Sequence, residues 1–288
     1  MVNKRQLYWR TIKLVLTCLP ALSFLLLFNP VRAQLLGEPE DESKLYAQSK
    51  QVNQFFKRFN GEEDEKGNRY YPTDKQYRSA KLRKKYLGIL FDESNSGINP
   101  LKKEFAEDVL SKPEASILDF HGGNWFAEVN ALFQLNGTDQ PITLYMELEK
   151  NHLGYKWVIT KAHSDRLDFY YARDTSKIGR FLHPMSHELD FMNLRKAFAH
   201  SDSISQFTIK NFKPDHLSVL LYEAKRGNLK FKSVESVRFH FFQINGWYFE
   251  LADFNRTGYN TGWLISNLVR LKDNTEKDIL KRYLYHEK

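Results

Sequence analysis

The sequence predicts an α+β protein whose helices pack on a curved antiparallel sheet. Between residues 45 and 110 apolar side chains recur at helical spacing, as in amphipathic helices. After Pro113 apolar and polar side chains alternate, as in a strand with one buried face. The order of helix and then strands begins again near Glu188. Two helix-and-strand cycles are therefore expected. Because short turns join the successive strands of each cycle, these strands should pair antiparallel.

In the first cycle, three helices are predicted within residues 45–59, 77–90 and 101–110. A charged loop bounded by glycines, residues 61–68, follows the first helix, and residues 94–100 end the second. Strands are predicted over residues 125–135, 142–148 and 155–162. Asn136-Gly137, a dipeptide typical of two-residue hairpin turns, separates the first two strands.

In the second cycle, one helix is predicted over residues 188–199. The strands expected after it cover residues 205–212, 217–222, 234–244, 247–254 and 263–271. Gly227-Asn228 and Asn245-Gly246 are expected to form turns. A charged helix over residues 273–285 follows the last strand.

Two local matches favour a tandem duplication. Residues 101–106 (LKKEFA) are similar to residues 194–199 (LRKAFA), and residues 156–162 (KWVITKA) are similar to residues 246–252 (GWYFELA). The alternative is that any two such units share a pattern because each buries one face. The predicted division is a first unit over 45–163, a linker over 164–186, a second unit over 187–271 and a C-terminal helix over 272–288.

This order of elements resembles the cystatin-like, NTF2-like superfold, in which a helical segment packs across a curved antiparallel sheet. Residues 45–163 are most similar to the NTF2-like form, and residues 186–271 resemble a shorter version. The resemblance rests on element order, since the superfold has no diagnostic motif. It implies a fold but no function, because NTF2-like folds include enzymes, ligand binders and assembly modules.

Residues 1–33 have the features of a secretory signal peptide. Basic residues precede an apolar run over residues 14–28, and Val31-Arg32-Ala33 offers small or apolar side chains for cleavage after Ala33. The run contains Pro20 and is shorter than the roughly 20 residues of a membrane span. We expect export to the periplasm or surface of a Gram-negative bacterium, a flexible lead-in over residues 34–44, and no transmembrane segment in the mature chain.

The leader and its Ala33-Gln34 junction resemble those of uncharacterised exported proteins of Bacteroidetes-type bacteria. The leader also accounts for most of the net charge of +8: without its five basic residues, 38 basic residues face 35 acidic ones, a net charge of +3. A nucleic-acid partner is therefore not expected. The one cysteine, Cys18, lies in the leader, so disulfides, cysteine-ligated metals and thiol nucleophiles are not expected in the mature chain.

Asp119 and His121 are the candidate acid–base pair, because side chains two apart on a strand share one face. The pair would lie inside the first α+β cone. Alternatively, both side chains point to solvent, and His121 begins a hairpin loop. His183 and His187 have the spacing of metal ligands on a helix, but Pro184 between them favours a loop or helix start. No metal site and no cofactor are therefore predicted.

Six aromatic residues are candidates for ligand or partner binding: Trp125, Tyr145, Trp157, Trp247, Tyr248 and Trp263. They would line a pocket or interface, or they would fill the core that a cysteine-free exported protein needs. The sequence favours a non-enzymatic binding or assembly module whose partner is an unknown envelope protein or small molecule. The alternative is a small-molecule enzyme that uses Asp119 and His121.

Overall fold

The computed structural model describes residues 51–111, 116–152, 154–169, 195, 198, 207–209, 212 and 214–287. All of these residues lie in the compact unit Lys44–Lys288. The predicted leader and lead-in lie outside the described residues. So do most of the predicted linker and most of helix 188–199. Of the predicted strand 205–212, residues 207–209 and 212 are described, and they do not lie in a strand.

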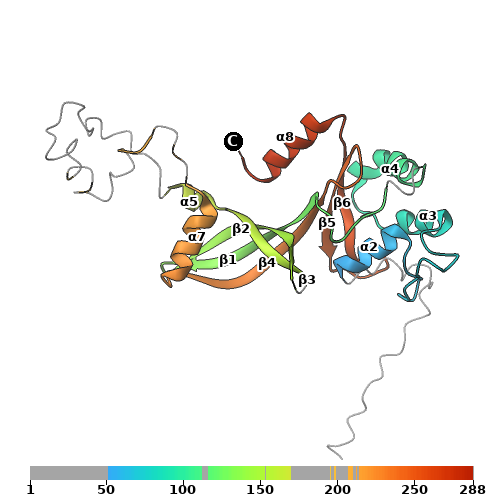
Figure 1. Ribbon diagram of the computed structural model, residues 1–288, viewed down its shortest axis with the longest axis horizontal. Coiled ribbons are helices and arrows are strands. Elements are labelled where there is room, and N and C mark those ends of the chain that lie inside the picture. The colour runs from blue at the N-terminus through green and yellow to red at the C-terminus, as the bar shows by residue number, and fades with distance from the viewer. Residues whose placement is uncertain are drawn as a thin grey trace, which may run out of the picture. The chain divides into compact units, whose positions relative to one another are not determined.

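The described residues form one six-stranded antiparallel sheet, which confirms the α+β class. The strands are β1 (Trp125–Leu135), β2 (Thr138–Asn151), β3 (Gly154–His163), β4 (Leu229–Phe241), β5 (Trp247–Phe254) and β6 (Gly262–Arg270). Their order across the sheet is β3-β2-β1-β4-β5-β6 (Figure 1). Because β1 pairs with β4, the strands of the two predicted units belong to one continuous sheet.

The described helices are α2 (Val52–Asn60), α3 (Ala80–Ile89), the 3-10 helix η2 (Ser96–Ile98), α4 (Asn99–Ser111), α5 (Asp165–Phe169), α7 (His216–Lys225) and α8 (Asn274–Leu284). Three of the predicted helices, those within 45–59, 77–90 and 101–110, correspond to α2, α3 and α4. Figure 1 shows α2, α3 and α4 at one end of the sheet, and α5 with α7 at the other.

The β1–β2 hairpin forms where the Asn-Gly dipeptide predicts it. Asn136 has φ 51° and Gly137 has φ 84°, so both lie in the left-handed region that a type I′ turn requires. The turn sets the register in which Leu135 lies opposite Thr138. The predicted bounds of strands 125–135 and 247–254 coincide with those of β1 and β5.

The strand predicted over residues 217–222 is wrong, because these residues lie in helix α7. Asp215 caps the helix by accepting hydrogen bonds from the backbone N–H groups of Leu217 and Ser218. Gly227, with φ 77°, follows the helical end. A short apolar run does not by itself distinguish a helix from a strand. Here Asp215 before the run and Gly227 after it favour the helix.

One of the two internal sequence matches, between residues 156–162 and 246–252, does not join strands at equivalent places in the sheet. Residues 156–162 lie on β3, an edge strand, whereas residues 247–252 lie on β5, between β4 and β6. Counted outward from the central β1–β4 pair, β5 corresponds to β2 and β3 corresponds to β6. The match therefore does not align equivalent strands. Of residues 194–199 in the other match, only 195 and 198 are among the described residues.

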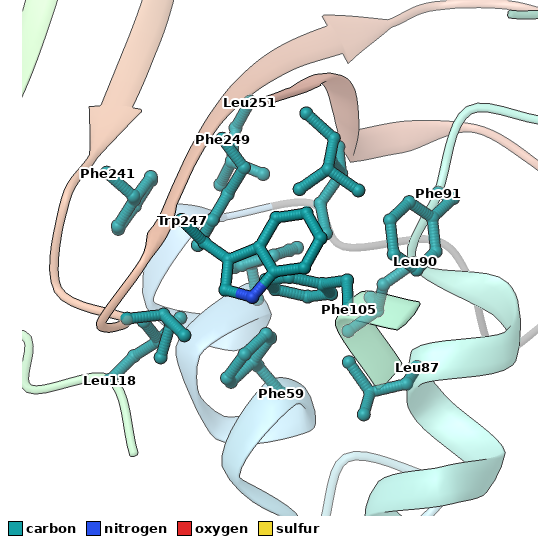
Figure 2. Close-up of a cluster of buried hydrophobic side chains, with 14 of the residues drawn as sticks. Phe59, Leu87, Leu90, Phe91, Phe105, Leu118, Phe241, Trp247, Phe249 and Leu251 are labelled. Atoms are coloured by element: carbon teal, nitrogen blue, oxygen red, sulfur yellow. The ribbon is translucent and has the colours of Figure 1, made fainter. Parts of the chain in front are cut away.

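An aromatic core joins α2 and α4 to the sheet. Figure 2 shows the Trp247 indole among Phe59, Phe105 and Phe249. The Phe105 ring lies 5.2 Å from the Trp247 ring and 5.8 Å from the Phe249 ring, in edge-to-face contacts that aromatic pairs favour. Phe59, Phe105, Trp247 and Phe249 are fully buried. This core fixes the helices against β5 and so determines which part of the sheet face they cover.

Buried polar contacts hold the segment that leads into β1. The Asn60 side chain donates to the Leu118 carbonyl at 2.8 Å and accepts from the Leu118 N–H at 2.9 Å. Arg83 donates to the Ser116 carbonyl at 2.6 Å. Burial, and then the charge of Arg78, lower the pKa of Arg83 to about 10, so it stays protonated at neutral pH. These contacts position the start of β1.

Truncation of Phe105 tests the aromatic core. We expect Phe105→Ala to lower the free energy of unfolding by about 3–5 kcal/mol, because it opens a cavity at a fully buried ring. Tyr283→Ala is the matched control, since that side chain is 76% exposed and should change stability by about 0.5 kcal/mol or less. Urea unfolding measures both variants. Equal free energies for the two would contradict this description of the core.

Candidate functional site

Four aromatic rings form a row across the sheet face on which α2, α3, α4, α5 and α7 pack. We call it the helix-bearing face; of the described helices, only α8 packs on the opposite face. We call Trp157 on β3, Trp125 on β1, Phe239 on β4 and Trp263 on β6 the aromatic row. The Trp125 ring lies 5.4 Å from that of Trp157 and 5.9 Å from that of Phe239. Phe239 lies 4.9 Å from Trp263. The row therefore reaches from an edge strand, β3, to the opposite edge strand, β6.

Strand register places these side chains on one face. Ala127 lies opposite Met146 on β2 and opposite Phe239 on β4. Residues directly opposite one another share a face, and residues two apart on a strand do so as well. Trp125 therefore shares the face of Ala127 and Phe239. Trp157 shares it too, because Trp157 lies opposite Leu148, two residues from Met146.

The row differs in exposure along its length. Its two inner rings, Trp125 and Phe239, are buried, whereas Trp157 is 38% exposed and Trp263 is partly buried. The Trp125 ring also stacks on Phe241, with 5.3 Å between the ring centroids, and this contact holds it in place. The buried rings thus hold the outer ones in a fixed position, with Trp157 offering the most accessible surface.

An apolar strip continues beside the aromatic row. Val129, Met146, Leu148 and Val237 are partly buried, and Ile159 is 37% exposed; we call these five residues the apolar strip. Val129 packs against both the cluster below α2, α3 and α4 and the cluster below α5 and α7. The strip therefore lies between the two helix-covered ends of this face, where the described helices leave the side chains partly open to solvent.

The other three aromatic candidates lie elsewhere. Trp247 is fully buried, and its indole N–H donates to Asp108 Oδ2 at 3.0 Å. Tyr145 and Tyr248 lie on the opposite face in a small cluster that α8 covers. Tyr145 donates to the Leu284 carbonyl at 2.7 Å, which ties α8 to the sheet. Burial raises the pKa of both tyrosines, so their phenols stay protonated. These positions favour a packing role.

Asp119 and His121 lie in the loop before β1 and are both exposed. Asp119 Oδ1 accepts a hydrogen bond from the His121 backbone N–H at 2.9 Å, a contact that shapes the turn. The imidazole stacks on Tyr155 at 4.2 Å. The structure thus brings the two residues together in a solvated turn, as in the loop alternative, and not along one strand.

A buried relay on the opposite face was not predicted. His240 is 1% exposed; its Nε2 lies 3.0 Å from Glu128 Oε2, and its Nδ1 lies 2.9 Å from the Tyr248 hydroxyl. Nε2–H can donate to the carboxylate, and the direction of the Nδ1–Tyr248 hydrogen bond depends on where the imidazole carries its proton. The sequence signal for this site was a histidine within the predicted strand 234–244; that it shares a face with Glu128 follows from the β1–β4 register, which the sequence does not reveal.

Hydrogen bonds keep Glu128 ionised. Burial alone would raise the pKa of this carboxyl, but the hydrogen bond and electrostatic attraction of His240, with a hydrogen bond from Asn130, hold it below its usual value. Asn130 in turn accepts from the Thr143 hydroxyl at 2.7 Å. The relay therefore links three strands, β2, β1 and β4, and reaches β5 through Tyr248.

In the described part of the chain, no group of three or more His, Cys, Asp or Glu side chains is arranged to hold a metal ion. His183 and His187 lie outside it. None of the helices described has both the length and the apolar character that crossing a membrane requires.

Comparison with protein-family models, with curated proteins and with solved structures found no match to this chain.

The Glu128–His240 contact makes stability depend on pH. A carboxyl whose pKa is lower in the folded state stabilises the fold above its unfolded pKa, about 4.3, and that stabilisation is lost as the pH falls through the folded value. Glu128→Gln should therefore lower the free energy of unfolding at pH 7 by about 1–3 kcal/mol. The deficit should shrink between about pH 5 and pH 3.

Urea unfolding of both proteins across that pH range measures the deficit. Glu149→Gln is the control, because that carboxylate is exposed and its ion pair with Lys156 lies at the surface. A deficit for Glu128→Gln that does not change with pH would show that the charge of Glu128 is not responsible.

Proposed function

We propose that this protein is an exported, non-enzymatic binding or assembly module, and that the aromatic row and apolar strip are its contact surface. The observation that carries this proposal is an apolar band left open between two helix-covered ends of one sheet face. Contiguous apolar surface of this kind marks interaction sites in globular proteins. Tryptophan, which supplies three of the four rings in the row, is also enriched among residues that dominate binding energy.

The rigidity of the surface supports a binding role. Trp125 and Phe239 are buried and contact the outer rings, so Trp157 and Trp263 are held in place before a partner arrives. Ordered side chains lose less conformational entropy on binding than mobile ones. The partner that fits such a surface presents apolar or aromatic groups, from either an envelope protein or a small molecule.

Location and family are part of the same proposal. The charged, apolar and small-residue order of residues 1–33 supports export to the periplasm or cell surface. The succession of helices and then a three-stranded meander, β1-β2-β3, supports an NTF2-like relationship for the first unit. The second meander, β4-β5-β6, supports a tandem arrangement in which the two units share one sheet.

The alternative function, a small-molecule enzyme with Asp119 and His121 as an acid–base pair, has less support. Both side chains are exposed to solvent, whereas catalytic acid–base groups are typically held in a cleft. One carboxylate oxygen of Asp119 is already used by the backbone of the turn. The turn accounts for this pairing without a catalytic role.

A substitution at the β6 end of the row tests the contact surface. The full chain is exported, purified and used to capture partners from envelope extract, with Trp263→Ser as the test variant. We expect at least a tenfold loss of the captured partner, because hot-spot residues contribute about 2 kcal/mol or more. Tyr283→Ser, an equally drastic change at an exposed aromatic residue of α8, should retain it. Undiminished capture by a folded Trp263→Ser variant would refute the proposed surface.

A further inference from the structure

The two edges of the sheet differ. On β6, the Ile265 N–H donates to the Leu90 carbonyl at 2.8 Å, and the Ile265 carbonyl accepts from the Asp92 N–H at 3.0 Å. The segment after α3 therefore covers part of that edge. On the outer side of β3, no strand or isolated bridge occurs among the residues that the structure describes. Every second residue of an edge strand points its N–H and C=O groups outward, so β3 offers a template for another strand.

The side chains of this edge are unusually apolar. Tyr155 is 42% exposed, and Trp157 and Ile159 are exposed nearly as much; all three point to the helix-bearing face. Lys156 and Val158 lie on the other face. Pairing with β2 is regular from Gly154 to Ile159, and a bulge interrupts it before Lys161. Residues 154–159 are therefore the stretch suited to pairing with a further strand.

We propose that β3 pairs antiparallel with β3 of a second copy of this chain, with Trp157 on the two-fold axis. In this register Tyr155 lies opposite Ile159 of the partner subunit, and Lys156 lies opposite Val158 of the partner subunit. Trp157 meets its own counterpart. Aromatic–aromatic and aromatic–β-branched pairs are the stabilising cross-strand combinations. Each apolar side chain of the exposed row thus receives an apolar partner, and no two like charges are opposite.

Neighbouring registers fit less well. Centring the pair on Lys156 places two ammonium groups directly opposite each other, which destabilises a strand pair. Centring it on Val158 sets Tyr155 opposite Lys161 of the partner subunit, beyond the bulge, where pairing is no longer regular. The self-complementary pattern around Trp157 is what favours a second copy over an unrelated strand.

The dimer goes beyond the proposed function, because two copies can pair whether or not another partner binds. The interface is small, so we expect a dissociation constant on the order of micromolar. Its consequence would be geometric: the two sheets become continuous, and the aromatic rows of the two copies meet at Trp157. A partner would then face one uninterrupted apolar band in place of two separate ones.

Sedimentation equilibrium of the full chain, between about 1 and 200 micromolar, tests the dimer. The unmodified protein should pass from monomer to dimer, and Trp157→Lys should stay monomeric because it places two charges on the axis. Phe231→Lys is the matched control, since that exposed β4 side chain should not affect assembly. A monomer at every concentration, or a Trp157→Lys variant that dimerises normally, would overturn the proposal.

Disulfide trapping tests the register. In a Cys18→Ser background, Lys156→Cys and Val158→Cys are oxidised separately and as a mixture. Directly opposite strand residues lie close enough for a disulfide, whereas diagonal ones do not. We expect a linked dimer in the mixture only. Linkage in either variant alone, or in none, would overturn the register. Partner capture is measured separately with Trp263→Ser, which leaves β3 unchanged, so the failure of one proposal is distinguishable from failure of the other.

Discussion

The antiparallel pairing of β1 with β4 joins strands that are far apart along the chain, and the rest of the structure is built around it. Trp125, Ala131 and Phe126, all on β1, belong to three different hydrophobic clusters. The His240 side chain on β4 crosses this pair to reach Glu128. One ladder of backbone hydrogen bonds therefore supports both faces of the sheet, including the helices that cover each of them.

The contact surface is a consequence of the same pairing. Phe239 comes from β4 and Trp125 from β1, and their contact completes the row only because the two strands are neighbours. With the helices grouped at the two ends of the helix-bearing face, the apolar band between them stays partly open. The opposite face instead carries the polar relay, which uses buried hydrogen bonds to fix strand register there.

Sequence patterns predicted the elements whose signals lie within a few neighbouring residues. Alternation and the Asn136-Gly137 turn predicted β1 with its observed bounds, because both signals act within a few residues. Helix α7 was missed, since an apolar run of its length fits either structure until the cap at Asp215 is recognised. The β1–β4 register follows no local pattern, so the sequence alone predicted neither the shared sheet nor the separation of Tyr248 from Trp157 onto opposite faces.

Native-state hydrogen exchange tests most directly whether β1 and β4 hold the two halves together. If they do, the slowest amides of β1-β2-β3 and of β4-β5-β6 will exchange through the same global opening, with one free energy and one denaturant dependence. Two different opening free energies, one for each group of three strands, would contradict this account and show that the halves unfold as separate units.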